Sequence, residues 1–430
     1  MRLATITSMA SSLHVMHGFK ESFMTSYQAI ESFNSSNPTQ AHIIRDDAEA
    51  LSIATTLSER FKEKSVQRDA ERILPFEEIE QFSQSGLWAI TVPKRFGGAD
   101  VSSLTVAKII ALFSGVDGSI GQIPQNHFYA LEVLRNTGTE QQKQKLYKEV
   151  LQGARFGNAL AEFKPKTAAQ KHTTITATEN GYLIQGEKFY CTGSLFAHRI
   201  PTLVIDEHGR EYLAFVKRES QGLSLVDNWS GFGQRVTGSG AVKFDRVFVA
   251  YDDVIPFDVA FDHPTLVGPF AQIMHAAIEV GIARAAFEET LKRVHQARPW
   301  IDSNVDTAAQ DPLTIYDVGR IAIDVRASEV LLKRAAQSID TAHLNTTAEH
   351  VALASLAVAK VRAHSTETAL KASSKLIELA GSRGSQRQDG LDRFWRNARV
   401  HTLHDAARWK YFFIGNYALN QIFPPRRGTL

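Results

Sequence analysis

Cysteine is almost absent from this chain of 430 residues, in which Cys191 stands alone. A single thiol excludes an internal disulfide framework and is typical of a reducing compartment, so the composition predicts a cytoplasmic protein. No apolar run approaches the roughly 18 residues needed to span a membrane, so no membrane segment is expected. Acids and bases nearly balance at a formal net charge of +2, which gives no reason to expect nucleic acid or an anionic lipid surface as a partner.

The start of the chain lacks the marks of a secretory signal. Residues 1–40 are rich in Ser and Thr, and they have neither a basic start beyond Arg2 nor a strong apolar core. We interpret them as a flexible N-terminal extension without chemistry. Met24 offers an alternative start, so the sequence leaves open whether residues 1–23 belong to the natural protein.

Hydrophobic periodicity divides the remainder into three regions. Residues 41–155 carry apolar side chains at spacings of three and four, which predicts a helical domain. Residues 156–258 contain short alternating segments punctuated by glycine, which predicts a compact β-barrel or sandwich. Residues 259–430 hold four long amphipathic patterns, the last from about residue 391 towards residue 417, which predicts a four-helix bundle. The expected fold is therefore α+β and multidomain: an N-terminal helical domain, a central β-barrel domain and a C-terminal four-helix bundle.

Two segments have plain structural interpretations. Asn126 and His127 lie in an apolar helical pattern that we expect to be entered through Pro124. A lone histidine there is more often a satisfied core residue than a catalytic one. Gly381 and Ser382 follow a long helical pattern and need no function as a helix end, although helix junctions in bundles also contact phosphates and rings.

Two loops of the β region are candidates for ligand contact. Thr192 lies beside glycine after a predicted strand, where small hydroxyl residues let a planar ligand approach the backbone; a simple turn is the favoured interpretation. The segment 229–240 combines Gly, Ser and Thr with Trp229, which suits an aromatic, phosphate-bearing ligand, and a plain loop is equally consistent. It is not a Rossmann fingerprint, because its glycine spacing is wrong and strands flank it.

The densest group of ionisable residues is Arg399–Asp405, which contains His401 and His404. On a helix, residues three apart share a face, so we expect the two imidazoles to be neighbours. Metal binding needs a third ligand at a usable spacing, and the sequence offers none. We therefore expect no metal, and a pair of buried structural histidines is the stronger local interpretation.

These motifs, in this order, resemble the acyl-CoA dehydrogenase superfamily over roughly residues 41–423. Four features carry the resemblance: Val92-Pro93 to Gly97-Gly98, Gly157-Asn158-Ala159, the strand Gly186 to Tyr190, and Arg298 at the end of a long helical pattern. Each is weak alone, but their order and spacing make the match specific.

One departure narrows the resemblance. Acyl-CoA dehydrogenases carry a catalytic glutamate in the bundle, often in a Tyr-Glu-Gly run, and Arg399–Asp405 contains none. The histidine-rich replacement resembles the flavin monooxygenase branch, to which dibenzothiophene monooxygenase belongs. Within it, the runs Gln-Asn-His-Phe, Trp-Ser-Gly-Phe-Gly-Gln-Arg and Thr-Leu-His-Asp are similar to the sulfur-acquisition oxidoreductase subgroup.

The resemblance implies a two-component monooxygenase that acts on a small organosulfur compound in sulfur acquisition. It implies reduced FMN as cofactor, with FAD as the alternative, a separate NAD(P)H:flavin reductase, O2, and a hydroperoxide at flavin C4a. It also implies a homotetramer, a dimer of dimers, with sites between protomers.

The resemblance also assigns roles to residues. It implies that four catalytic side chains face the reactive edge of the flavin: His127, Asn158, Thr192 and His404. It implies cofactor contacts from eight more: Asn126, Trp229, Thr237, Ser239, Arg298, Gly381, Ser382 and His401. Arg298 would meet the phosphate from a neighbouring subunit, and Gly381 and Ser382 would close the site across an interface. His404 is the expected proton donor, because an imidazole titrates near pH 6.5 and needs little tuning.

Two other functions stay open at the level of sequence. One is an FAD-dependent acyl-CoA dehydrogenase whose catalytic base has moved elsewhere in the chain. The other is a non-catalytic flavin-binding or scaffold homologue. Tightly held FAD would favour the first, and failure to bind any flavin would favour the second.

Overall fold

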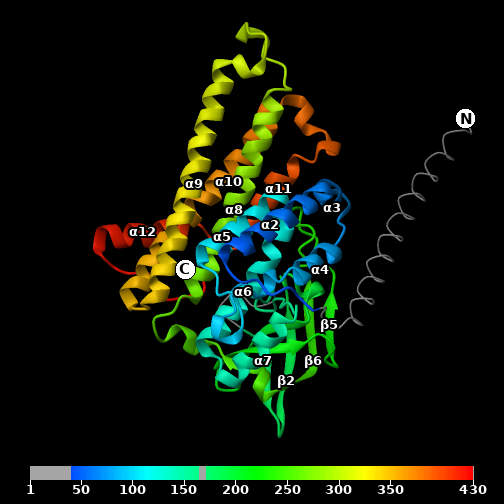
Figure 1. The fold of residues 1–430 in the computed structure, drawn as a ribbon, viewed down its shortest axis with the longest axis vertical. Helices are drawn as coiled ribbons and strands as arrows, with labels where there is room; N and C mark the ends of the chain where they lie inside the picture. The colour runs from blue at the N-terminus through cyan, green and yellow to red at the C-terminus, as the bar shows by residue number, and fades with distance from the viewer. Residues whose placement is uncertain (1–39, 164–170, 430) are drawn as a thin grey trace, which may run out of the picture.

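The computed structural model describes residues 40–163 and 171–429, and Figure 1 shows them as helical layers above a sheet. The predicted N-terminal extension therefore lies, apart from residue 40, outside the described residues. The N-terminal region is helical, as expected, with α2 (Asp47–Glu63), α3 (Ser65–Glu71), α4 (Phe76–Gln84), α5 (Ser103–Val116), α6 (Gly118–Thr137) and α7 (Glu140–Leu151).

Side-chain caps explain where these helices begin. Ser102 accepts a hydrogen bond from the backbone of Thr105 at the start of α5, and Thr139 forms a capping box with Gln142 at the start of α7. Asp117 caps α6, so this helix begins before Pro124 and contains it. The prediction that the helix is entered through Pro124 was wrong, because the Asp117 cap fixes an earlier start. Every residue of α6 from Gly118 to Leu134 is buried.

The central region is one curled sheet of seven strands in the order β5-β6-β2-β1-β3-β4-β7. The strands are β1 (Thr174–Ala177), β2 (Gly181–Lys188), β3 (Arg199–Ile205), β4 (Glu211–Lys217), β5 (Leu223–Val226), β6 (Ala241–Ala250) and β7 (Val254–Pro256). Neighbouring strands are antiparallel except β1 and β3, which pair in parallel at Thr174 and Ile205. The register of β2 against β6 shifts between Ile184 and Gly186, where a β-bulge bends the sheet. Its inner face forms a small core of its own around Ile184, Val204 and Phe244.

The C-terminal region contains three long helices, α8 (Val267–Val294), α9 (Pro312–Leu344) and α10 (Ala348–Leu379), followed by α11 (Asp392–His401) and α12 (Arg408–Asn420). The single final helix expected from residue 391 to 417 is thus two. Helix α11 ends because the chain tightens after His401: the His404 N–H bonds to the His401 carbonyl, only three residues back. The chain then turns, and α12 projects from the side of the bundle (Figure 1).

Helix α8 lies at the centre of the bundle, where it packs against α5, α6, α9 and α10. All its residues from Val267 to Ala283 are buried, including His275 and Glu279. Burying an ionisable residue costs free energy unless the residue is paired. His275 and Glu279 therefore mark a place in the bundle whose role is something other than packing. None of the described helices combines the length and apolarity needed to cross a membrane.

Candidate functional site

Three hydroxyl side chains from two loops of the sheet meet in a buried row, which we call the hydroxyl cluster. Thr192 Oγ1 lies 2.7 Å from Ser239 Oγ, which lies 2.6 Å from Thr237 Oγ1. Thr237 donates its proton to the Gln234 carbonyl at 3.0 Å. Because each hydroxyl has one proton, Ser239 must then donate to Thr237, and Thr192 to Ser239. The oxygen of Thr192 is therefore left as a hydrogen-bond acceptor at the head of the row.

Asn158 lies beside this cluster with one side-chain atom unused. Its backbone N–H donates to Ser194 Oγ at 3.0 Å, and its side-chain amide donates to the Tyr190 carbonyl at 3.2 Å. Its Oδ1 is buried without a hydrogen-bond partner among the described residues. Tyr190 has a left-handed backbone with φ of 58°, which costs free energy in a residue other than glycine and is typical of ligand-binding loops.

The loop 229–240 connects the sheet to the helices. The Trp229 indole N–H donates to the Gln234 carbonyl at 2.8 Å, and its ring meets Tyr190 edge-on at 6.1 Å. A Cβ on Gly233 would lie 2.0 Å from the Arg396 carbonyl, so glycine is required there for the loop to touch α11. The Gln234 N–H donates to Asn397 Oδ1 of α11 at 2.7 Å. This loop therefore holds the hydroxyl cluster against the bundle.

Other buried amides at this junction are also unsatisfied. Both side-chain amide atoms of Gln234 are buried without partners in the described part of the chain, as is Oε1 of Gln125 on α6. Each buried polar group left unpaired costs about 1–3 kcal/mol, so such groups in native proteins are paired with a ligand or with water. The junction of sheet, α6 and α11 therefore offers polar contacts to a ligand.

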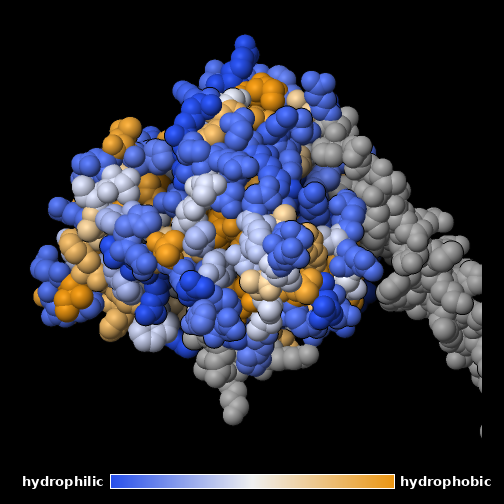
Figure 2. Space-filling view, turned by 90° about the horizontal axis from the view of Figure 1, so that it is seen from below, coloured by the Kyte–Doolittle hydropathy of each residue, from blue (hydrophilic) through white to orange (hydrophobic). Residues whose placement is uncertain are grey.

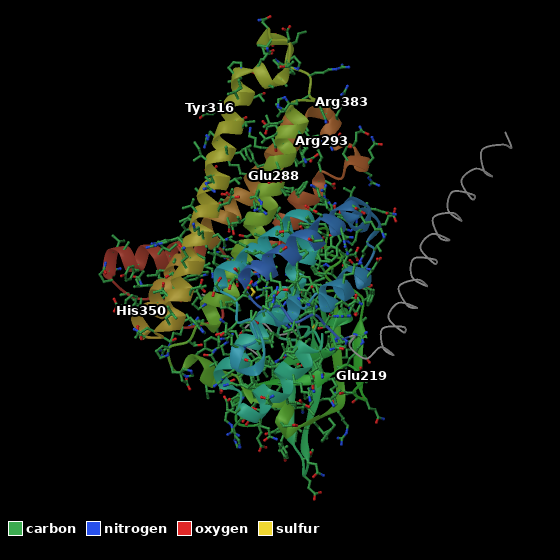
Figure 3. All side chains as sticks on the ribbon, in the orientation of Figure 1. Glu219, Glu288, Arg293, Tyr316, His350 and Arg383 are labelled. Atoms are coloured by element: carbon green, nitrogen blue, oxygen red, sulfur yellow. The ribbon has the colours of Figure 1, made fainter. Side chains whose placement is uncertain are left out.

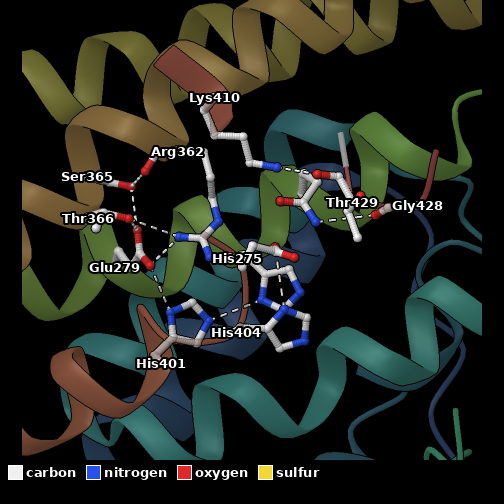
Figure 4. Close-up of polar contacts among 12 residues, drawn as sticks. His275, Glu279, Arg362, Ser365, Thr366, His401, His404, Lys410, Gly428 and Thr429 are labelled. Atoms are coloured by element: carbon white, nitrogen blue, oxygen red, sulfur yellow. Dashed lines mark hydrogen bonds and ion pairs between the residues drawn. The ribbon is translucent and has the colours of Figure 1, made fainter. Parts of the chain in front are cut away.

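Three histidines form a second group in the bundle, the histidine cluster: His275 on α8, His401 at the end of α11 and His404 in the following turn (Figure 4). Nδ1 of His275 lies 3.1 Å from Nε2 of His401. The rings of His275 and His404 lie against each other, with centroids 4.0 Å apart and planes inclined by 39°. The prediction that His401 and His404 are neighbours is correct in space, although a tight turn rather than a helix brings them together.

A buried carboxylate completes the cluster. Glu279 Oε1 lies 3.1 Å from Nδ1 of His401 and pairs with the guanidinium of Arg362. Its Oε2 accepts hydrogen bonds from Ser365 at 2.8 Å and Thr366 at 2.9 Å. Burial opposes the charge of Glu279, but attraction to Arg362 and the hydrogen bond from His401 outweigh it and lower its pKa to about 2. Glu279 is thus a permanent anion with both oxygens occupied.

The three imidazoles differ in their environment. Burial lowers the pKa of His275 and of His401, so both are neutral at pH 7. The His404 side chain is 44% exposed, and its Nδ1 lies 3.4 Å from Asp405 Oδ2. Burial of Asp405 raises its pKa, but the hydrogen bond and charge of His404 outweigh burial and hold that pKa well below its usual range. His404 is therefore the imidazole of this cluster that solvent reaches.

The expectation that no third metal ligand exists was incomplete, because one nitrogen each from His275 and His404 and one oxygen of Asp405 lie within 4.8 Å of one another. His275 comes from a separate helix, so spacing along the sequence could not show it. The two rings pack against each other with planes inclined by 39°, so the geometry gives no support to a shared ion, because the lone pairs of an imidazole lie in the ring plane.

His127 has a structural partner at each ring nitrogen, and its catalytic role stays a prediction. It is fully buried; its Nε2–H donates to the Trp88 carbonyl at 2.8 Å, and its Nδ1 accepts the Phe156 N–H at 3.0 Å. Burial lowers its pKa to about 3. Both ring nitrogens thus bond to the backbone and join α6 to the segment that enters the sheet. Asn126 is buried beside it on the same helix.

Three predicted contacts lie far from the hydroxyl cluster in this chain. Arg298, Gly381 and Ser382 are exposed, and they follow the ends of α8 and α10. Arg293 and Arg383, which mark this region in Figure 3, lie at the end of the bundle remote from the sheet. One chain therefore does not bring these residues together with Thr192 or Asn158.

Local sequence reasoning missed His275, Glu279 and Arg362. A signal was present, since His275 and Glu279 are four residues apart in an apolar helical pattern and thus share a face. Charged residues in such a pattern must be paired once buried, so a partner such as Arg362 could have been sought.

Known proteins share both the sequence pattern and the fold of this chain. The profile of the acyl-CoA dehydrogenase N-terminal domain matches residues 48–154, and that of the C-terminal domain matches residues 273–409. The dibenzothiophene monooxygenase of Mycolicibacterium goodii is 30% identical over 392 residues, covering 87% of this chain and 94% of that protein. A probable FMNH2-dependent monooxygenase, SfnC, of Pseudomonas putida is 29% identical over 386 residues, covering 87% and 96%. The crystal structure of FMN-bound TdsC from Paenibacillus sp. A11-2 superposes with a TM-score of 0.84 at 29% identity, covering 89% of this chain and 100% of that one.

Proposed function

This chain belongs to the acyl-CoA dehydrogenase family, in its branch of flavin-dependent monooxygenases, and from that premise we propose where its reaction takes place and which side chains serve it. The protein is a reduced-flavin-dependent monooxygenase that acts on an organosulfur compound, with FMN as cofactor and a separate reductase as the source of reduced flavin. We assign the reaction to the junction between the hydroxyl cluster and the histidine cluster. A cytoplasmic location stays a prediction.

The polar groups at the junction fit the heterocyclic ring of FMN. The acceptor oxygen of Thr192 and the unpaired Oδ1 of Asn158 match the N–H groups of a reduced flavin, which are donors. Ser239 and Thr237 orient Thr192, and Trp229 supplies an aromatic wall beside Tyr190. Reduced FMN supplies the two electrons that, with O2, turn one oxygen atom into water and deliver the other to the sulfur compound.

Proton supply falls to the histidine cluster. His404 is the imidazole in contact with solvent, and its Nδ1 lies 3.4 Å from the carboxylate of Asp405. We assign the acid role to the Nε2–H of His404, because its Nδ1 faces Asp405. The neutral, buried rings of His275 and His401 exclude water behind it. Asn397 on α11 lies one turn before His401 and joins the two clusters.

One observation argues against a dehydrogenase with a displaced base. Glu279 is the fully buried glutamate of the bundle, and its pKa is near 2 with four donors around its two oxygens. A carboxylate so strongly stabilised is a poor base for removing a carbon-bound proton.

Exposed apolar side chains support a homotetramer. Helix α9 leaves Leu313, Tyr316 and Ile323 between 60% and 74% exposed, and α12 leaves Trp409 and Phe412 each 53% exposed. Figure 2 shows further apolar residues scattered over a largely hydrophilic face at the sheet end of the molecule. Large exposed apolar patches mark protein–protein interfaces. In such an assembly a neighbouring protomer can bring Arg298 to the FMN phosphate, and Gly381 and Ser382 to the edge of the site.

The experiment is oxygen incorporation. Purified protein, FMN, a flavin reductase, NADH and ¹⁸O2 are incubated with dibenzothiophene and small sulfones, and the products are analysed by mass spectrometry. One ¹⁸O atom incorporated into the product per turnover supports the function. Desaturation of an acyl-CoA with FAD, and no labelled product from any sulfur compound, would refute it. Equilibrium titration with FMN and FAD in both redox states accompanies the assay.

A further inference from the structure

We propose that Glu279 is a positioning residue: through His401 it fixes His275 as the Nδ1–H tautomer and so leaves the Nε2 of His275 as a proton acceptor beside His404. The inference rests on the proposed function only where it names His404 as the acid. It concerns three side chains, Glu279, His401 and His275, which are each buried to at least 98%.

The anion sets the direction of the hydrogen bonds. Arg362, Ser365 and Thr366 all donate to Glu279, and an ionised carboxylate can only accept. The contact between Glu279 Oε1 and Nδ1 of His401 therefore requires a proton on that nitrogen. A neutral imidazole has one N–H, so Nε2 of His401 carries a lone pair.

The same reasoning applies to the next ring. Nε2 of His401 accepts, so Nδ1 of His275, 3.1 Å away, must be the donor. The remaining nitrogen of His275, Nε2, then has a lone pair. Figure 4 shows the three side chains in this order, with His404 against the last of them. Through two consecutive hydrogen bonds, the charge of Glu279 thus determines which nitrogen of His275 carries the proton.

This tautomer determines which groups His275 presents to its neighbour. With its proton on Nδ1, the ring that packs against His404, at 4.0 Å between centroids, has a lone pair on Nε2 and no second N–H. Asp405 lies on the other side of the pair, 3.4 Å from Nδ1 of His404.

The test is nitrogen NMR of flavin-free protein with ¹⁵N-labelled histidine, measured in the solid state at pH 7.5. His275 and His401 are assigned from the signals lost in His275→Phe and His401→Phe. We expect both rings to show a protonated Nδ1 and an unprotonated Nε2. Glu279→Gln supplies an amide that can donate, so we expect both rings to change to the Nε2–H form. Unchanged tautomers in Glu279→Gln, or Nε2–H forms in the wild type, would overturn the inference.

Matched variants separate positioning from stability. Glu279→Asp keeps the anion and should keep the wild-type tautomers. Glu149→Gln removes a carboxylate from buried Arg199, 2.7 Å away in a different region, and should leave both signals unchanged.

If Glu279→Gln does not fold, His401→Phe serves instead: it leaves the Glu279–Arg362 pair intact, and the Nδ1–H form of His275 should no longer be exclusive. His401→Gln, which can both donate and accept, should restore it. A His275 signal that is the same in His401→Phe as in the wild type would overturn the inference.

A second measurement connects the tautomers to the reaction. In Glu279→Gln, the yield of oxygenated product per reduced FMN consumed should fall about 10- to 100-fold, the usual effect of removing a residue that orients a functional histidine. FMN affinity should stay within about twofold of wild type, because Glu279 lies outside the hydroxyl cluster. If wild-type protein oxygenates no sulfur compound, the proposed function fails, whereas the NMR result still decides the tautomers.

Discussion

Gln234 and Asn397 join the sheet to the bundle: the Gln234 N–H donates to Asn397 Oδ1 at 2.7 Å, although the two residues are 163 positions apart in the chain. The carbonyl of the same Gln234 accepts from Thr237 and from the Trp229 indole. One peptide segment thus ends the row of hydroxyls and touches the helix that carries His401.

Replacing Asn397 should therefore weaken both clusters. Asn397 is 4% exposed, so Asn397→Ala leaves the buried Gln234 N–H unpaired and should lower the free energy of unfolding by about 1–3 kcal/mol. Asn397→Asp keeps the acceptor and is the matched control for the lost hydrogen bond. Urea denaturation of the flavin-free proteins measures the change. Equal stability of Asn397→Ala and wild type would mean that this contact contributes nothing.

Thr192 should contribute to FMN binding through its acceptor oxygen. Thr192→Val keeps the shape but removes that oxygen, and it also leaves Ser239 without its donor. The loss of one hydrogen bond corresponds to about 1 kcal/mol, or roughly fivefold weaker binding of reduced FMN in an anaerobic titration. Thr192→Ser should bind as the wild type does. Indistinguishable affinities for Val and Thr would remove Thr192 from the flavin contacts.

His404 should be needed for oxygen transfer and not for flavin binding. His404→Ala should lower product formation by about 10²–10⁴-fold, the range expected for a lost general acid, with FMN affinity largely unchanged. Reduced flavin should still be oxidised, so that hydrogen peroxide accumulates in place of product. His350→Ala, at a partly exposed histidine in the first turn of α10, serves as control. Full product yield from His404→Ala would rule out this role.

The contribution of His127 to the free energy of unfolding should depend on pH. Its folded pKa is about 3 because of burial, whereas the ordinary value of 6.5 applies to the unfolded chain. Between these values the unfolded state binds more protons, so the stability that His127 contributes is present above pH 6.5 and is lost as the pH falls towards 3, by about 1.4 kcal/mol per pH unit.

The variant His127→Phe tests this dependence. It loses the bonds to Trp88 and Phe156 and should be less stable than wild type at pH 7. That difference should shrink between pH 6.5 and pH 4 in urea denaturation, because Phe does not titrate. A constant difference would contradict the pKa assigned to His127, and loss of FMN binding in a folded variant would support its predicted role in the site.

The order of the three regions could be predicted from sequence because hydrophobic period is a local property. Hydroxyl and amide residues of two loops could be proposed together, but only the fold shows that Thr192 and Ser239 touch. Only part of the histidine cluster could be predicted: His401 and His404 are three residues apart in sequence, whereas His275 and Glu279 come from a helix more than a hundred residues earlier. The structural bonds of His127 could not be predicted, since its two backbone partners lie 39 and 29 residues away and leave no trace in local sequence.

The break between α11 and α12 has a consequence for how the chain can vary. Because α11 stops at His401, Leu403 lies outside the packed core with 66% of its surface exposed, although Thr402 before it is still buried. The length of an exposed turn can change at little cost, about 0.6 kcal/mol for a doubling of loop length. Changes beside Leu403 should therefore reshape the surface next to His404 at little cost in stability, while the anion that orients the imidazoles stays fixed inside the bundle.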